Sequence, residues 1–168
     1  MKRVILDTNI YGEIIINKDI ELIKSLTRNK LLVYGLSIVR KELKQTPKTI
    51  KIDHENKKRK LQIILLELYD FLVKNRFLEL SGFIEKLSSD YYIVYREIGG
   101  NLSKQEMQND FLIVACASIY HIEVVYSGDN RTMLSKKAIE AYNIVNKING
   151  LKNPEFKNYE VFKKDVIN

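Results

Sequence analysis

Four acidic side chains in this sequence stand where they can do chemistry together: Asp7, Glu42, Asp110 and Asp129. Carboxylates held ~4–6 Å apart repel at roughly 3–4 kcal/mol per close pair in an effective dielectric of ~20. They therefore either take up protons, which raises their pKa values, or bind a divalent cation. Because the chain has two histidines and one cysteine, all-oxygen ligation favours Mg²⁺ or Mn²⁺ over zinc. Such an ion binds a phosphodiester, lowers the pKa of a bound water and stabilises the departing oxygen.

Two of these acids follow short apolar strands. Asp7 comes directly after three apolar residues in "RVILDTN", and Asp129 comes directly after "VVYSG". Parallel sheets place their working residues beyond the carboxyl ends of the strands, so the two carboxylates converge if the strands are neighbours. Each also has a structural interpretation, as a strand-end cap for Asp7 and as an Asx-turn for Asp129.

The other two acids lie on predicted helices. Asp110 shares a face with the apolar residues Ile113, Val114 and Ala117, and burying a carboxylate without an evident partner is costly. Glu42 lies at the margin of the apolar stripe of a helix that Ser37 is expected to cap. The alternative for Glu42 is an ion pair with a neighbouring lysine.

Small polar residues flank the acids, and we expect them to orient the carboxylates or a water molecule. They are Thr8, Asn9, Ser127 and Asn130. Such residues are also common in ordinary turns.

The elements that must position these residues alternate between short apolar strands and helices. We expect strands at 3–7, 31–35, 77–80 and 122–127, with a weak strand near 159–162. We expect one or two helices within 10–28 and others at 37–44, from 53 or 55 to 75, at 81–97, from a capping box at 103–106 to 120, and at 134–147. This order predicts a three-layer α/β/α sandwich with a central, mainly parallel sheet of four to five strands.

Length and composition indicate a single domain of 168 residues, with a C-terminal extension at about 150–168. The one cysteine, Cys116, excludes an internal disulfide framework and is expected in the core. No signal-peptide pattern and no run long enough to span a membrane occurs, so we expect a cytoplasmic protein.

The net charge of +7 comes almost entirely from residues 40–60, which hold nine basic residues against three acids. We expect a basic helical region at about 40–75 whose cations bind an RNA backbone. The candidate RNA-binding residues are Arg40, Lys41, Lys57, Lys58, Arg59 and Lys60. The alternative is a solvated, lysine-rich helix face.

The motifs "VILDTNIYG", "LSIVRKEL", "NDFLIVACAS" and "VVYSGDNRTM" together resemble the PIN domain family, over residues 3 to about 133. The resemblance implies that the family's metal-binding acids fall on Asp7, Glu42, Asp110 and Asp129. It implies Mg²⁺- or Mn²⁺-dependent hydrolysis of RNA, commonly leaving 5′-phosphate ends, a tendency to form homodimers and, in the toxin branch, a cognate antitoxin. Where the family often has a further acid, this chain has Asn130.

We therefore expect a metal-dependent endoribonuclease, of the toxin or the RNA-processing branch. The alternative is a catalytically silent RNA-binding or assembly module that uses the same fold. A phosphatase of the haloacid dehalogenase type also begins with a strand-end aspartate, but it uses a second aspartate where this chain has Asn9.

Overall fold

A five-stranded parallel sheet forms the centre of the molecule, in a computed structural model that describes residues 1–167 and, outside 25–29, their side chains. Its strand order is β5-β2-β1-β6-β7. The strands are β1 Lys2–Leu6, β2 Leu31–Leu36, β5 Phe77–Leu78, β6 Val124–Tyr126 and β7 Glu155–Lys157. The central strands β1 and β6 are apolar and buried, as parallel strands covered on both faces require.

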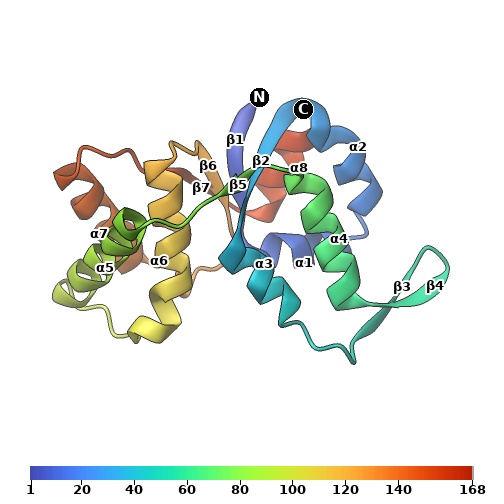
Figure 1. Cartoon of the computed structure of the whole chain (residues 1–168), viewed down its shortest axis with the longest axis horizontal. Coiled ribbons are helices and arrows are strands. Elements are labelled where there is room, and N and C mark those ends of the chain that lie inside the picture. The colour runs from blue at the N-terminus through green and yellow to red at the C-terminus, as the bar shows by residue number, and fades with distance from the viewer. Residues whose placement is uncertain (168) are drawn as a thin grey trace.

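Helices cover both faces of the sheet, which gives the expected three-layer α/β/α architecture (Figure 1). One group packs on one face: α5 Gly82–Glu97, α6 Lys104–Ile119 and α7 Lys136–Ile148. The other group consists of α1 Thr8–Ile16, α2 Ile20–Lys30, α3 Ser37–Lys44, α4 Leu61–Val73 and α8 Tyr159–Ile167. Right-handed crossovers between parallel strands place successive helices on such faces.

The α6 helix passes through the core, since every residue from 111 to 118 is buried, Cys116 among them. The predicted capping box begins this helix: the Ser103 hydroxyl accepts from the amide of Glu106, whose carboxylate accepts from the amide of Ser103. The helix therefore runs from a fixed N-terminus back along the sheet, and Asp110 lies in its second turn.

The segment 51–60 is a hairpin and not the start of a helix, so this part of the sequence-based prediction is wrong. Its strands are β3 Lys51–His54 and β4 Lys57–Lys60, which pair antiparallel. Glu55 and Asn56 both have positive φ, of 52° and 62°, as the two central residues of a type I′ hairpin turn require. The long helix is confined to α4.

Two smaller predictions are also wrong. Ser37 does not cap α3, because Leu36 occupies the N-cap without a side-chain bond and Ser37 is the first helical residue. The segment near 159–162 lies in helix α8, whose first turn is capped when Asn158 accepts a bond from the amide of Val161. None of the helices in residues 1–167 is both long and apolar enough to cross a membrane.

Candidate functional site

The ends of β1 and β6 lie side by side, which is the condition under which we expect Asp7 and Asp129 to converge. The amide of Asp7 donates a 2.9 Å bond to the carbonyl of Tyr126, one step beyond the last paired residues of the two strands. Asp7 therefore faces Ser127, the residue that follows β6. This contact fixes the edge of the sheet at which the acidic residues gather.

Asp7 is buried, at 5% exposure, and three donors bond its carboxylate. The backbone amide of Thr8 donates a 2.7 Å bond to Oδ1. The side-chain amide of Asn9 and the hydroxyl of Ser127 donate bonds of 2.6 and 2.7 Å to Oδ2. Burial raises the pKa of Asp7; the bonds from Ser127 and Thr8 oppose this rise, and the negative charge of Glu42 adds to it. Asp7 thus caps α1, although its burial disfavours the charged form of its carboxylate.

Asn9 and Ser127 tie the two strand ends together. The side-chain oxygen of Asn9 accepts a 2.8 Å bond from the Gly128 amide, and the Ser127 hydroxyl accepts one of 3.1 Å from the Asp129 amide. Oδ1 of Asp129 accepts from the amides of Arg131 and Thr132, both at 2.9 Å, so the turn does not engage Oδ2. The Asx-turn interpretation of Asp129 is therefore compatible with a second role for its free oxygen.

Glu42 is held by two hydrogen bonds and by none of the lysines near it in the sequence. The Thr8 hydroxyl donates a 2.5 Å bond to Oε2, and the side-chain amide of Asn109 donates a 2.5 Å bond to Oε1. Asn109 is the residue before Asp110, so these bonds connect α3 to α1 and to α6. Asn109 is not among the residues that the sequence predicts for the site. Its position directly before Asp110 is the sequence feature that could have pointed to it.

Asp110 lies in an environment that strongly disfavours the charged form of its carboxylate. Burial raises its pKa to about 7; a hydrogen bond from Thr132 opposes the rise, and the charges of Asp7, Asp129 and Glu42 add to it. Among the side chains described, no lysine or arginine forms an ion pair with any of the four. The edge of the sheet therefore concentrates negative charge without a cation from the protein.

The donor chemistry of this edge fits a hard divalent cation, because all of its charged groups are oxygens. The charge of Glu42 raises the pKa of Asp7, and the charges of Asp7, Asp129 and Glu42 raise that of Asp110. Within the described residues, however, no three or more His, Cys, Asp or Glu side chains are gathered closely enough to hold a metal ion. The described acids are therefore not gathered as tightly as the sequence predicts, although Thr8 bonds both Asp7 and Glu42.

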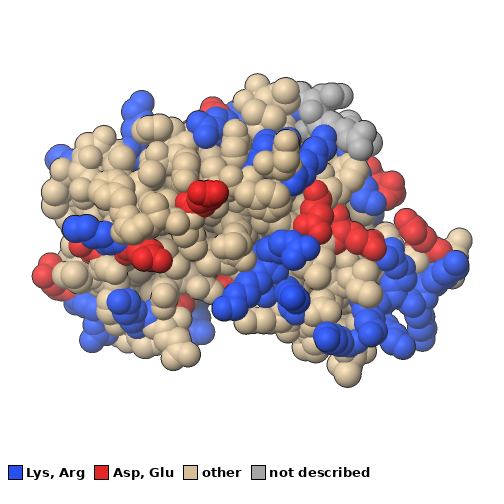
Figure 2. Space-filling view, viewed as in Figure 1, with Lys and Arg blue, Asp and Glu red and all other residues tan. Residues whose placement is uncertain are grey.

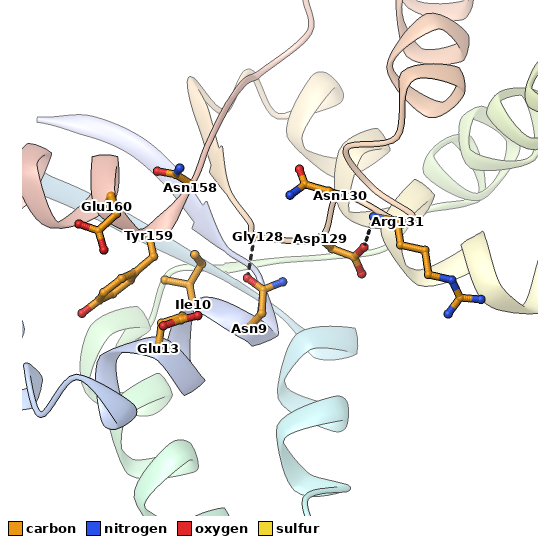
Figure 3. A pocket seen from close by; sticks show the side chains of 10 residues that line it. All are labelled: Asn9, Ile10, Glu13, Gly128, Asp129, Asn130, Arg131, Asn158, Tyr159 and Glu160. Carbon is orange, nitrogen blue, oxygen red and sulfur yellow. Dashed lines mark hydrogen bonds between the residues drawn. The ribbon is translucent and has the colours of Figure 1, made fainter.

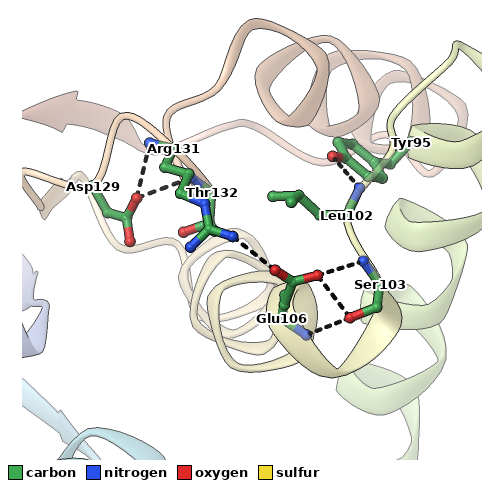
Figure 4. A network of polar contacts seen from close by, with 7 residues as sticks. All are labelled: Tyr95, Leu102, Ser103, Glu106, Asp129, Arg131 and Thr132. Atoms are coloured by element: carbon green, nitrogen blue, oxygen red, sulfur yellow. Dashed lines mark hydrogen bonds and ion pairs between the residues drawn. The ribbon is translucent and has the colours of Figure 1, made fainter.

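Arg131 links the loop after β6 to the start of α6 (Figure 4). Its guanidinium donates a 2.7 Å bond to Glu106, the acid of the capping box, while its amide bonds Asp129. The ion pair lies at the surface, where both side chains are exposed. It also fixes the loop that presents Asp129.

A hollow of about 620 Å³ opens beside the acids (Figure 3). Asn9 and Glu13 of α1 line it on one side, and Asp129 and Asn130 of the loop after β6 line it on another. The segment from Asn158 to Glu160 at the start of α8 completes it. Asn130 is exposed in this hollow, and its amide bonds the carbonyl of Gly128, so it shapes the loop through the backbone.

The candidate RNA-binding cations fall into two classes. Arg40 makes two bonds, of 3.0 and 2.9 Å, to Asp70, and Arg59 donates a 2.6 Å bond to Glu67. The four lysines at 41, 57, 58 and 60 are exposed and form no ion pair among the described side chains. Figure 2 shows basic side chains over α3 and over the hairpin on one face.

No family model and no curated protein matches the sequence. Among solved structures, the fold is similar to that of a chain in the crystal structure of VapBC2 from Rickettsia felis bound to a DNA fragment from their promoter. The TM-score is 0.55 at 14% sequence identity, and the match covers 93% of this chain and 98% of that chain. At this identity the likeness shows the fold, and it agrees with the PIN-like α/β architecture expected from the sequence.

Proposed function

We propose that this chain is a divalent-metal-dependent endoribonuclease whose acids lie at the carboxyl edge of β1 and β6. The observation that carries the proposal is the charge at this edge: four carboxylates interact, and none is paired with a lysine or arginine among the described side chains. Keeping such a site costs stability, so it points to a ligand that compensates the charge.

In this proposal Asp7, Asp110 and Asp129 would hold Mg²⁺ or Mn²⁺ after the ion draws their carboxylates closer together than they lie in the structure, and Glu42 would hold it or position a water. When bound, the ion supplies an activated water and stabilisation of the departing oxygen. Thr8 and Asn109 hold the Glu42 carboxylate, while Asn9 and Ser127 hold that of Asp7. The hollow beside Asp129 gives room for the nucleotides that flank the cleaved phosphate.

The basic face supplies attraction for the RNA backbone. Lys41, Lys57, Lys58 and Lys60 are the contacts we propose, because Arg40 and Arg59 are engaged by acids of α4. The fold likeness to a VapBC2 chain supports a toxin role with a cognate antitoxin. A homodimer is the further partner that we propose. A small antitoxin that binds the chain and blocks cleavage would support this branch.

Cleavage of a labelled RNA, with and without EDTA, tests the proposal. We expect cleavage only with Mg²⁺ or Mn²⁺, at internal positions and leaving 5′-phosphate ends. The separation of the acids favours a second candidate, an RNA-binding module without catalysis. That candidate predicts RNA binding with no cleavage under any metal, a result that would refute the enzyme proposal.

A further inference from the structure

The hairpin formed by β3 and β4 holds like charges directly opposite one another. Lys51 pairs with Lys60 in the antiparallel register, and only the next pair on the same face, Asp53 with Lys58, joins opposite charges. Opposed like charges destabilise a strand pair. A two-stranded hairpin is itself only marginally stable, so this arrangement works against its folding.

One face of the hairpin attaches it to the body of the molecule. Ile52 and Arg59 are opposite partners and are both partly buried. Ile52 lines an apolar hollow with Ile15 and Leu65, and Arg59 bonds Glu67 of α4. Because side chains alternate along a strand, the residues between these point the other way.

The outward face of the hairpin carries three lysines, at 51, 58 and 60, and one acid, Asp53. All four are exposed, and none forms an ion pair among the described side chains. Protein interfaces are depleted in lysine and depend on aromatic or apolar anchors, whereas nucleic-acid interfaces are polar and positive. The outward face has no such anchor, so its composition fits a nucleic acid better than a protein.

The lysines continue from the hairpin towards the acids. Lys48 lies in the loop before β3, and Lys41 and Lys44 lie on α3, the helix that also carries Glu42. The hairpin stands at one end of the molecule, and α3 lies between it and the ends of the central strands (Figure 1). Figure 2 shows basic side chains on this face over both elements.

We propose that the β3–β4 hairpin is an arm that binds the RNA backbone beyond the acids. The substrate class is then RNA long enough to reach from the sheet edge across α3 to the hairpin. The polyanion also relieves the repulsion between the opposed lysines. The inference rests on RNA as the proposed substrate, and it does not depend on the cleavage step.

Binding without cleavage tests the arm. The triple variant Lys51→Gln, Lys58→Gln and Lys60→Gln is made in an Asp110→Asn background, and affinities for single-stranded RNAs of about 6 and about 30 nucleotides are measured in EDTA. We expect at least tenfold weaker binding of the long RNA and a log–log salt slope reduced by about 2 for three lost phosphate contacts. Binding of the short RNA changes less than twofold.

The matched control removes three exposed lysines elsewhere: Lys147→Gln, Lys152→Gln and Lys164→Gln. We expect it to leave the affinity for long RNA within about twofold. Equal losses for both RNA lengths, equal losses in the control, or competition by poly-L-glutamate as strong as that by RNA of equal charge would overturn the inference. The last outcome would identify an acidic protein as the partner.

A single charge reversal separates binding from folding. Lys60→Glu places an acid opposite Lys51, so amide hydrogen exchange within 51–60 should slow while affinity for the long RNA falls at least fivefold. Lys147→Glu, with the same change of charge on α7, should do neither. Unchanged affinity in Lys60→Glu would contradict the arm.

The two proposals fail separately. Lysine-dependent binding of long RNA by a chain that never cleaves contradicts the enzyme and supports the arm. Metal-dependent cleavage with the same KM for short and long RNA supports the enzyme and contradicts the arm.

Discussion

The Ser127 hydroxyl donates a 2.7 Å hydrogen bond to Oδ2 of Asp7, across the ends of the central strands β1 and β6. The two residues are 120 positions apart in the sequence. This bond fixes the orientation of a buried carboxylate and joins the segments that carry Asp7 and Asp129. It is therefore the contact through which the fold shapes the candidate site.

Ser127→Ala removes that bond and leaves the Asp7 carboxylate less satisfied. We expect the free energy of unfolding at pH 8 to fall by about 1–3 kcal/mol, and the Mg²⁺ needed for half-maximal cleavage to rise about 10- to 100-fold. Urea denaturation and metal titration measure the two effects. The control is Ser118→Ala, at another buried serine that bonds Tyr91 and Asn146; it should lower stability alone. Unaltered metal dependence in Ser127→Ala would contradict this role.

Asp110 should make the protein less stable as the pH rises. Its pKa is about 7 in the fold against an ordinary 3.8, because of burial and then of the neighbouring acids. Between these values the folded chain binds a proton that the unfolded chain has released, so the free energy of unfolding falls with rising pH. Asp110→Asn abolishes this titration. In EDTA the variant should be more stable than wild type by about 1 kcal/mol or more at pH 8, with the difference shrinking towards pH 4.

Asp165→Asn is a control for which we expect the opposite change in the free energy of unfolding. Burial raises the pKa of Asp165, but hydrogen bonds from Tyr126 and Lys157 outweigh it and lower the pKa. The charged Asp165 carboxylate therefore stabilises the fold above its ordinary pKa. This stabilisation is lost as the pH falls through the pKa that Asp165 has in the folded state. Asp165→Asn should therefore destabilise at pH 8. Melting curves in which Asp110→Asn also destabilises at pH 8 would refute the expected strain at Asp110.

Asn109→Ala tests whether the hold on Glu42 matters. The variant removes the donor to Oε1 and leaves the Thr8 bond to Oε2, so the carboxylate gains freedom to rotate. Loss of such a supporting contact typically costs 10- to 100-fold, and we expect that loss in the cleavage rate. Gln108→Ala, at the preceding exposed position of α6, should cleave like wild type. Equal rates for the two variants would mean that Glu42 needs no such positioning.

Arg40 and Lys41 are neighbours with different expected roles. Arg40→Gln breaks the ion pair with Asp70, at the surface, and should cost about 0.2–1 kcal/mol of stability with little effect on RNA affinity. Lys41→Gln should preserve stability and weaken RNA binding with a smaller salt slope. Thermal melts and salt-dependent binding assays separate them. The assignment fails if Arg40→Gln weakens binding as much as Lys41→Gln.

The sequence predicts the parts of this fold that local patterns determine. The apolar runs that precede Asp7 and Asp129 identify the central strands, and Ser103 with Glu106 identifies the start of α6. Each of these sequence patterns is about six residues long or shorter. The order of strands and helices then predicts the parallel sheet, because crossovers have one hand.

The hairpin was missed because its residues favour other structures. Lysine and arginine are good helix formers, and the turn at Glu55 and Asn56 lacks the glycine that marks most type I′ turns. What holds the hairpin is tertiary: Ile52 packs beside Ile15, and Arg59 bonds Glu67. Such long-range contacts override the local helix propensity, and no pattern in the neighbouring sequence predicts them.

The sequence proposes the residues of the candidate site but not the distances between them. Strand ends identify Asp7 and Asp129, since carboxyl ends of parallel strands share an edge. The bond from Asn109 to Glu42 spans 67 positions and has no sequence pattern. The distances among the described acids depend on long-range contacts of this kind, so no local sequence pattern predicts them.

The cleavage rate of Asp110→Asn tests the central claim most directly. Single-turnover cleavage of a labelled RNA in Mn²⁺ is compared for wild type, Asp110→Asn and the control Asp90→Asn, a half-buried acid of α5 that pairs with Lys86. Circular dichroism first establishes that all three are folded. We predict cleavage by wild type and Asp90→Asn and a loss of at least about a thousandfold in Asp110→Asn, because the variant loses a charge at the ion. Cleavage by Asp110→Asn at the wild-type rate would contradict this prediction.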